Sequence, residues 1–228
     1  MQTLTKKNTL FPIKTLAIVC LSLILCSNSH AQRLAADSLA KKPFGIGQIA
    51  APSVLVTSGS LFTFNPYLKG LSVDLRDYVQ SNGHNPFRID DVFQYVPAAS
   101  VYLLKACGLE SKHSYKDIAK VTAISYISMA ATVLTLKNTT KIQRPDGRSF
   151  NSFPSGHTAT AFVGAEILRR EYGEKHPYIA VAGYTVATGV GLMRIYNNRH
   201  WAGDVMAGAG IGILCAGLSY LITPYLTF

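Results

Sequence analysis

The sequence is poor in charged residues, and in acidic residues above all. Only 15% of its 228 residues are charged and 48% are apolar, whereas soluble domains carry roughly a quarter charged residues. The 22 Lys and Arg outnumber the 12 Asp and Glu, which gives a formal charge of +10. Basic proteins often bind nucleic acid, phosphates or anionic lipid surfaces. The zinc-finger spacing, aromatic RNA-reading box and basic arm of nucleic-acid binders are missing, so we expect a membrane protein with no nucleic-acid partner.

Cysteine is scarce as well. Cys20 and Cys26 lie in the N-terminal segment, whereas Cys107 and Cys215 each lie inside an apolar stretch. We expect the latter two to be buried as small hydrophobic residues rather than joined in a disulfide or paired as ligands. Internal repeats, low-complexity tracts and clear linkers are also missing, so residues 32–228 are predicted to form one domain.

Residues 1–31 have the pattern of a secretory signal peptide. Lys6, Lys7 and Lys14 precede a short apolar run over residues 15–26, and the small residues in 29–31 follow where a signal peptidase would cut. The run is short for a membrane span, which needs about 20 residues. We therefore predict that this segment is cleaved, with an uncleaved anchor as the alternative.

Five apolar stretches predict an all-α fold, a multi-pass membrane bundle of about five to six helices. They are too long for strands and rich in Ala and Gly. The stretches are 92–109, 118–136, 159–168, 178–193 and 205–222. Residues 46–64 are more polar, so we expect them to re-enter the membrane or lie on its surface, as does the amphipathic patch 68–79.

Two features predict how the bundle is packed and oriented. Gly208 and Gly212 have the small-x-x-x-small spacing that lets membrane helices approach closely. The short loops 110–117 and 169–177 are basic, and such loops usually face the cytoplasm. Residues 137–155 and 194–204 would then face the periplasm of a bacterial inner membrane, provided that 46–64 does not cross fully.

His200 and Asp204 are the first candidates for chemistry. They are four residues apart and would share one face of a helix. A carboxylate can hold one ring N–H of an imidazole and leave a lone pair on the other nitrogen, which prepares histidine as a nucleophile or base. Taken alone, the pair is also compatible with a helix cap and a surface ion pair.

A second cluster begins a predicted helix. Ser155 is a favoured N-cap, and a helix start offers free N–H groups to a phosphate. Gly156 would let a ligand approach the backbone, and His157 could donate a proton to a departing oxygen. Alone, this is also the pattern of an ordinary helix start with an exposed histidine.

Three cations complete the set. Arg144 and Arg194 could clamp phosphate oxygens with forked hydrogen bonds, while Lys137 would act as a point charge. Each could otherwise be a solvated loop charge. Together with the two histidines and the carboxylate, however, they supply what phosphoryl transfer needs: charge stabilisation, an activated nucleophile and an acid for the leaving group.

In order and spacing, the three clusters over residues 137–204 resemble the signature of the type 2 phosphatidic acid phosphatase (PAP2) superfamily. The resemblance implies that His200 forms a phosphohistidine, that Asp204 orients it and that His157 protonates the leaving group. It also implies a phosphate site made by Lys137, Arg144, Arg194, Ser155 and Gly156. No metal or other cofactor is implied, which agrees with the lack of an acidic metal cluster in the sequence. Met193 departs from the Ser that usually precedes the third-motif Arg.

The resemblance implies a membrane phosphatase acting on a phosphate monoester or diphosphate of a lipid, such as undecaprenyl diphosphate, lipid A or a phosphatidate. Its partners would be the lipid substrate and the membrane, with no obligate protein partner. One alternative is a soluble periplasmic non-specific acid phosphatase of the same superfamily, which the Gly-rich apolar segments disfavour. Another is a non-catalytic lipid-binding membrane protein, which explains the helices but not the three clusters.

Overall fold

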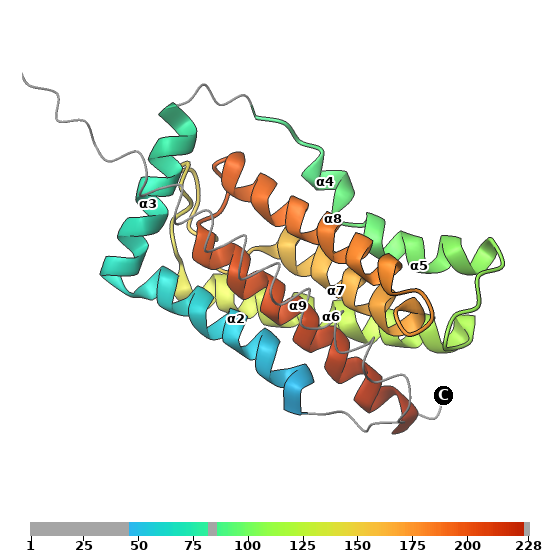
Figure 1. Ribbon diagram of the computed structural model, residues 1–228. Coiled ribbons are helices and arrows are strands. Elements are labelled where there is room, and N and C mark those ends of the chain that lie inside the picture. The colour runs from blue at the N-terminus through green and yellow to red at the C-terminus, as the bar shows by residue number, and fades with distance from the viewer. Residues whose placement is uncertain (1–45, 82–85, 226–228) are drawn as a thin grey trace, which may run out of the picture.

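The computed structural model describes residues 46–81 and 86–225, and these residues form helices and connections without strands. The predicted all-α fold is therefore confirmed, while the segment 1–31 lies outside the described residues. The elements are α2 (Ile46–Phe64), α3 (Pro66–Ser81), α4 (Asp90–Phe93), α5 (Val96–Ala106), α6 (Tyr115–Thr140), α7 (Gly156–Tyr172), α8 (Pro177–Tyr196), α9 (Ala202–Ile222) and the short 3-10 helix η1 (Thr223–Tyr225). The long helices lie side by side in an elongated bundle, with α3 at one end (Figure 1).

Helices α7 and α9 form the centre of the bundle. Helix α7 packs against α5, α6, α8 and α9, while α9 packs against α2, α6 and α7. Their side chains are buried along most of their length, as for Phe162 and Val205. These two helices therefore fix the positions of all the others.

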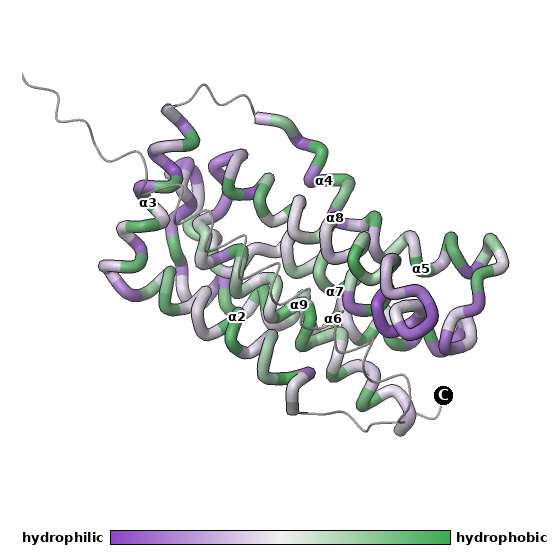
Figure 2. The backbone as a smooth tube through the Cα atoms, viewed as in Figure 1, coloured by the Kyte–Doolittle hydropathy of each residue, from purple (hydrophilic) through white to green (hydrophobic). Residues whose placement is uncertain are grey.

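The outer helices have the two faces expected of membrane helices. The buried residues of α6 recur every three or four positions, from Ile118 to Val133, which defines one inward stripe. On the opposite side, Ile127 is 70% exposed and Leu134 is 59% exposed. Helices α6, α8 and α9 are long and apolar enough to span a bilayer, and hydrophilic residues gather around α3 and the connections at the bundle ends (Figure 2). The multi-pass membrane fold is confirmed.

The close approach predicted for Gly208 and Gly212 is confirmed. A Cβ atom at Gly208 would lie 2.5 Å from the carbonyl oxygen of Ser155, and one at Gly212 would lie 2.5 Å from that of Ala159. Real Cβ atoms do not approach backbone this closely, so only glycine fits. These contacts hold the start of α7 directly against α9.

Helix α2 corrects the expectation for residues 46–64. It is an uninterrupted helix that lies lengthwise along α9, with Gly210 against the Pro52 carbonyl and Gly203 against the Gly59 carbonyl. The re-entrant or surface-lying interpretation is therefore wrong. Its polar side chains bond within the helix, as Ser60 Oγ does to the carbonyl oxygen of Val56 (2.8 Å), so their polarity does not prevent them from lying against another helix.

The stretch 92–109 also differs from its prediction, because a turn at Gln94 and Tyr95 divides it into α4 and α5. Helix α5 ends at Ala106, which leaves Cys107 exposed at its C-cap. The predicted burial of Cys107 is therefore wrong, whereas Cys215 is buried and both thiols are free.

Gly210→Ala tests the packing of α2 on α9. The added methyl group would meet backbone atoms of Pro52 and Val56 within 3 Å, which should cost about 1–3 kcal/mol of stability. At Gly189 a Cβ atom meets nothing within 4 Å, so Gly189→Ala should be neutral or slightly stabilising. Thermal unfolding in detergent compares the two variants, and equal midpoints would contradict the packing.

Candidate active site

The predicted site residues gather at one end of the bundle. There the starts of α7 and α9 meet, because the backbone N–H of Ser155 donates to the carbonyl oxygen of Asp204 (2.9 Å). The end of α8, which carries Arg194, and the end of α6, which carries Lys137, lie at the same end. The second and third sequence clusters are thus joined directly.

His200 and Asp204 meet across the start of α9 rather than along it. Helix α9 begins at Ala202, so His200 precedes the helix and the two residues do not share a helical face, although the pair forms. His200 is 2% exposed, and its Nδ1 lies 3.4 Å from Asp204 Oδ2. That oxygen accepts hydrogen bonds from Ser152 Oγ (2.5 Å) and from the backbone N–H of Trp201 (2.9 Å).

The surroundings of His200 keep it neutral. Burial, together with the charges of Lys137 and Arg194, lowers the pKa of His200 to about 4, although Asp204 opposes the shift. A neutral imidazole has the lone pair that attack on phosphorus requires. The imidazole is therefore in its nucleophilic form at neutral pH.

The start of α7 has the predicted cap. Ser155 Oγ accepts from Thr158 Oγ1 (2.8 Å) and from the Thr158 backbone N–H (3.5 Å). Because Ser155 is fully buried, its hydroxyl acts as the N-cap of α7. A Cβ at Gly156 would meet only Val133, at 3.8 Å, so protein packing does not require glycine there. The space and the free amides of the first turn are suited to a ligand oxygen.

The three cations approach the site from different elements. Lys137 Nζ donates to the carbonyl oxygen of Asn151, and Arg144 Nε donates to Oδ1 of the same residue (2.8 Å). Arg194 is 6% exposed, and its Nε has no hydrogen-bond acceptor among the described residues. Burial lowers the pKa of Arg144, and repulsion from Arg194 adds to this. A bound anion would relieve both costs.

Three of the predicted site residues line one cavity of about 310 Å³. Its lining includes Arg144, His157 and Arg194 together with Arg88, Asp90, Asp91, Asn197 and Arg199. The structure thus brings three predicted residues into one cavity, while His200 lies buried beside Asp204 and is not part of the lining.

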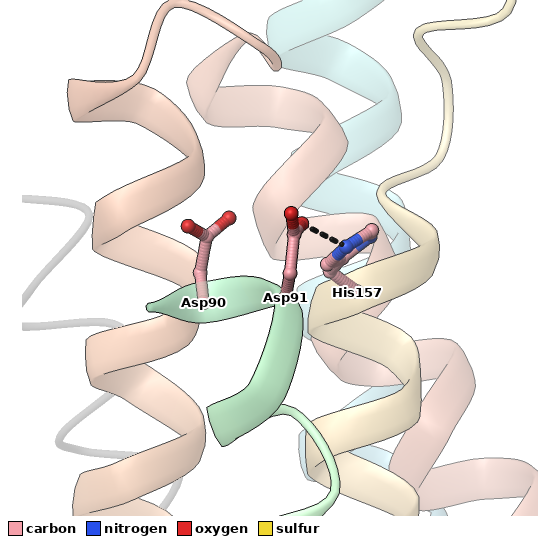
Figure 3. Close-up of side chains that lie close together, drawn as sticks. All are labelled: Asp90, Asp91 and His157. Carbon is pink, nitrogen blue, oxygen red and sulfur yellow. Dashed lines mark hydrogen bonds and ion pairs between the residues drawn. The ribbon is translucent and has the colours of Figure 1, made fainter. Parts of the chain in front are cut away.

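Two acidic residues in this cavity were missed from the sequence. Asp90 accepts from Arg194 Nη1 (2.5 Å) and from Asn197 Nδ2 (3.0 Å). Asp91 Oδ1 lies 2.9 Å from His157 Nε2 (Figure 3). The same oxygen lies 3.5 Å from Arg194 Nη1. Although burial opposes it, hydrogen bonds from His157 and Arg88 hold the pKa of Asp91 below its usual value. The sequence feature that could have identified them is a pair of carboxylates directly before an apolar stretch.

The same residues correct the expectation that an acidic metal cluster is lacking. Asp90, Asp91 and His157 each offer one ligand atom within 4.8 Å of the others. The guanidinium of Arg194 already pairs with Asp90 at 2.5 Å. A metal ion would therefore meet a fixed positive charge, so these donors fit an ion-pair network better than a metal centre.

The fold and this end of the bundle define a multi-pass helical membrane protein with His157 and several arginines around one cavity and His200 buried at the same end. The sequence profile of the PAP2 superfamily matches residues 75–228, and the chain belongs to this superfamily.

Individual relatives point in the same direction. A Porphyromonas gingivalis protein named lipid A 1-phosphatase is 38% identical over 174 residues, covering 75% of this chain and 38% of that protein. A Helicobacter pylori (strain J99) protein of the same name is 40% identical over 76 residues, covering 33% of this chain and 38% of that protein. The chain thus spans about two fifths of their length. The crystal structure of Aquifex aeolicus LpxE matches with a TM-score of 0.51 and 27% identity, covering 65% of this chain and 94% of that one.

Orthovanadate, a tetrahedral oxyanion, tests the cavity. We expect Arg144→Gln and Arg194→Gln to weaken its binding about tenfold or more, because each removes a charged hydrogen-bond donor worth about 1.5–3 kcal/mol. The control is Arg148→Gln, since Arg148 is exposed and does not line the cavity. Calorimetry measures the affinities. The same affinity in all three variants would exclude a phosphate-binding role for the two arginines.

Proposed function

We propose that this protein is a membrane phosphatase that removes a phosphate from a lipid through a phosphohistidine at His200. The observation that carries the proposal is the buried, neutral His200 beside Asp204, at the end of the bundle where Arg144, His157 and Arg194 line a cavity. Membership of the PAP2 superfamily supports the same chemistry.

Each residue has a role in this reaction. The lone pair on Nε2 of His200 attacks phosphorus while the bond to the leaving oxygen breaks. The leaving oxygen takes the electron pair and a proton from His157. Lys137, Arg144 and Arg194 stabilise charge on the transferring oxygens, with the amides of Gly156 and His157. Water then attacks the phosphohistidine, gives a proton back to His157 and frees His200.

We propose a lipid A-type phosphate as the substrate, and undecaprenyl diphosphate and phosphatidates as the comparison substrates. Relatives named lipid A 1-phosphatase support this choice. A lipid substrate is also supported by a mainly apolar cavity of about 410 Å³ between α5 and α8, lined by residues such as Val96, Leu103 and Val186. Val96 lies only five residues after Asp91, so an apolar surface adjoins the polar cavity.

Phosphate release from purified protein tests the nucleophile. His200→Ala should reduce release from a lipid A-type phosphate by at least about a thousandfold, since it removes the group on which the proposed covalent intermediate forms. His176→Ala, at the opposite end of α8, should leave the rate unchanged. The wild-type rate should fall as the pH drops through about 4, because His200 then gains a proton and loses its lone pair.

Two results would contradict the assignment. Equal release by wild type and His200→Ala would remove His200 from the reaction. A wild-type protein that releases phosphate from none of the three lipid classes would argue for the non-catalytic alternative.

We further propose that the protein lies in the bacterial inner membrane with its site facing the periplasm. Support comes from the basic residues at the far end of the bundle from the site. Lys112 and Lys175 lie in the connections there, whereas Arg169 and Arg170 belong to the last turn of α7 rather than to a loop. Helix α2 begins at that far end, where Gln48 Oε1 accepts from Arg170 Nη2 (3.0 Å). In this orientation α2 begins on the cytoplasmic side, whereas cleavage of a signal peptide over 1–31 would place its start in the periplasm, so cleavage is not part of the proposal.

Cysteine labelling tests the orientation. Arg148→Cys, in the exposed loop at the site end, should react with a membrane-impermeant maleimide in intact cells with a permeable outer membrane. The native Cys107 is exposed at the far end and should react only after lysis. Arg148→Cys is labelled in a variant that lacks Cys107, and Cys107 is labelled in the chain that keeps Arg148. Labelling of Cys107 in intact cells, with Arg148→Cys reacting only after lysis, would place the site in the cytoplasm.

A further inference from the structure

His157 has a carboxylate partner that lies outside the three sequence clusters. Asp91 Oδ1 is 2.9 Å from His157 Nε2, and the two side chains approach from α4 and α7 (Figure 3). His157 and Asp91 are 30% and 34% exposed. The pair therefore lies at the open side of the cavity, where a substrate would enter.

The position of Asp91 is fixed by its neighbours. Its other carboxylate oxygen accepts from Arg88 Nε (2.9 Å). The adjacent Asp90 is buried and held by Arg194 and Asn197, and the side chain of Asn197 also bonds both backbone groups of Phe87. The segment leading into Asp91 is thus anchored to the end of α8 through Phe87 and Asp90.

We propose that Asp91 is the positioning residue of the acid His157: it holds the Nε2–H and leaves the Nδ1 proton for the leaving oxygen. This inference rests on the proposed phosphatase chemistry. It gives His157 the arrangement that Asp204 gives His200, a carboxylate that sets which ring nitrogen does the chemistry.

The proton balance follows from this tautomer. As the bond from phosphorus to the leaving oxygen breaks, that oxygen takes the electron pair and the Nδ1 proton. His157 becomes neutral, with Nε2–H still donated to Asp91 and a lone pair on Nδ1. The attacking water then gives one proton to Nδ1 as its oxygen bonds to phosphorus, which restores the starting state.

Asp91 also offsets the positive charges that face His157. Arg88, Arg144, Arg194 and Arg199 line the same cavity, with Asp90 as the other acid. Burial and the charge of Arg194 lower the pKa of His157, while Asp91 and Asp90 raise it. Without Asp91, the acid should lose its proton at a lower pH.

Two substrates with different leaving groups separate positioning from phosphate binding. A lipid phosphate leaves as an alkoxide-like oxygen and needs the proton, whereas p-nitrophenyl phosphate leaves as a stable phenolate and does not. Asp91→Asn should lower kcat for the lipid phosphate about tenfold or more and shift the upper limb of its pH profile to lower pH. The rate with p-nitrophenyl phosphate should change less than about threefold, and Asp91→Glu should restore part of the loss.

The control is Asp77→Asn, because Asp77 is an exposed acid on α3 paired with Arg76. Equal losses on both substrates, or no loss on either, would overturn the role of Asp91, provided that Asp91→Asn unfolds at the wild-type temperature. If it does not, Asp91→Glu decides: a partial loss confined to the lipid phosphate supports the role, and an equal loss on both substrates overturns it. Failure of the wild type to release phosphate from either substrate would instead overturn the proposed function itself.

Discussion

The buried carboxylate of Asp204 is the interaction on which the site depends. It accepts from Ser152 and from the Trp201 backbone, while its own carbonyl oxygen accepts from Ser155. These bonds tie the start of α9 to the start of α7 and to the loop that carries Arg144. Because Asp204 is fully buried, losing any one of them would leave a polar group unpaired in the interior. The two histidines keep their relative position only while this junction holds.

The junction in turn depends on small residues. Gly208 and Gly212 bring α7 against one face of α9, while Gly203 and Gly210 bring α2 against another. In a bilayer, where helices gain little from hydrophobic burial, such close contacts provide much of the packing energy. The scaffold is thus closely packed where the backbones of α2 and α7 touch α9, and the site lies at one end of these contacts.

Much of this could be predicted from the sequence, because the informative residues mark helix ends. Ser155 caps α7 as expected, and Arg194 ends α8 beside His200. The path of α2 could not be predicted, since its serines and threonines are satisfied by bonds inside the helix. Asp90 and Asp91 were missed for a different reason: their partners Arg194 and His157 are 66 residues or more away in the chain. Sequence patterns that extend over a few residues do not reveal pairs of residues this far apart in the chain.

The contact between Asp90 and Arg194 has a consequence for the binding of an anion to this site. The guanidinium that would grip a phosphate already has an internal counter-ion, so an arriving anion competes with a resident one. Ground-state affinity for a phosphate would then be lower than the number of cations suggests, and under the proposed function inorganic phosphate would dissociate more readily after each turnover. By competing with phosphate for Arg194, Asp90 would favour release of the product over its tight binding.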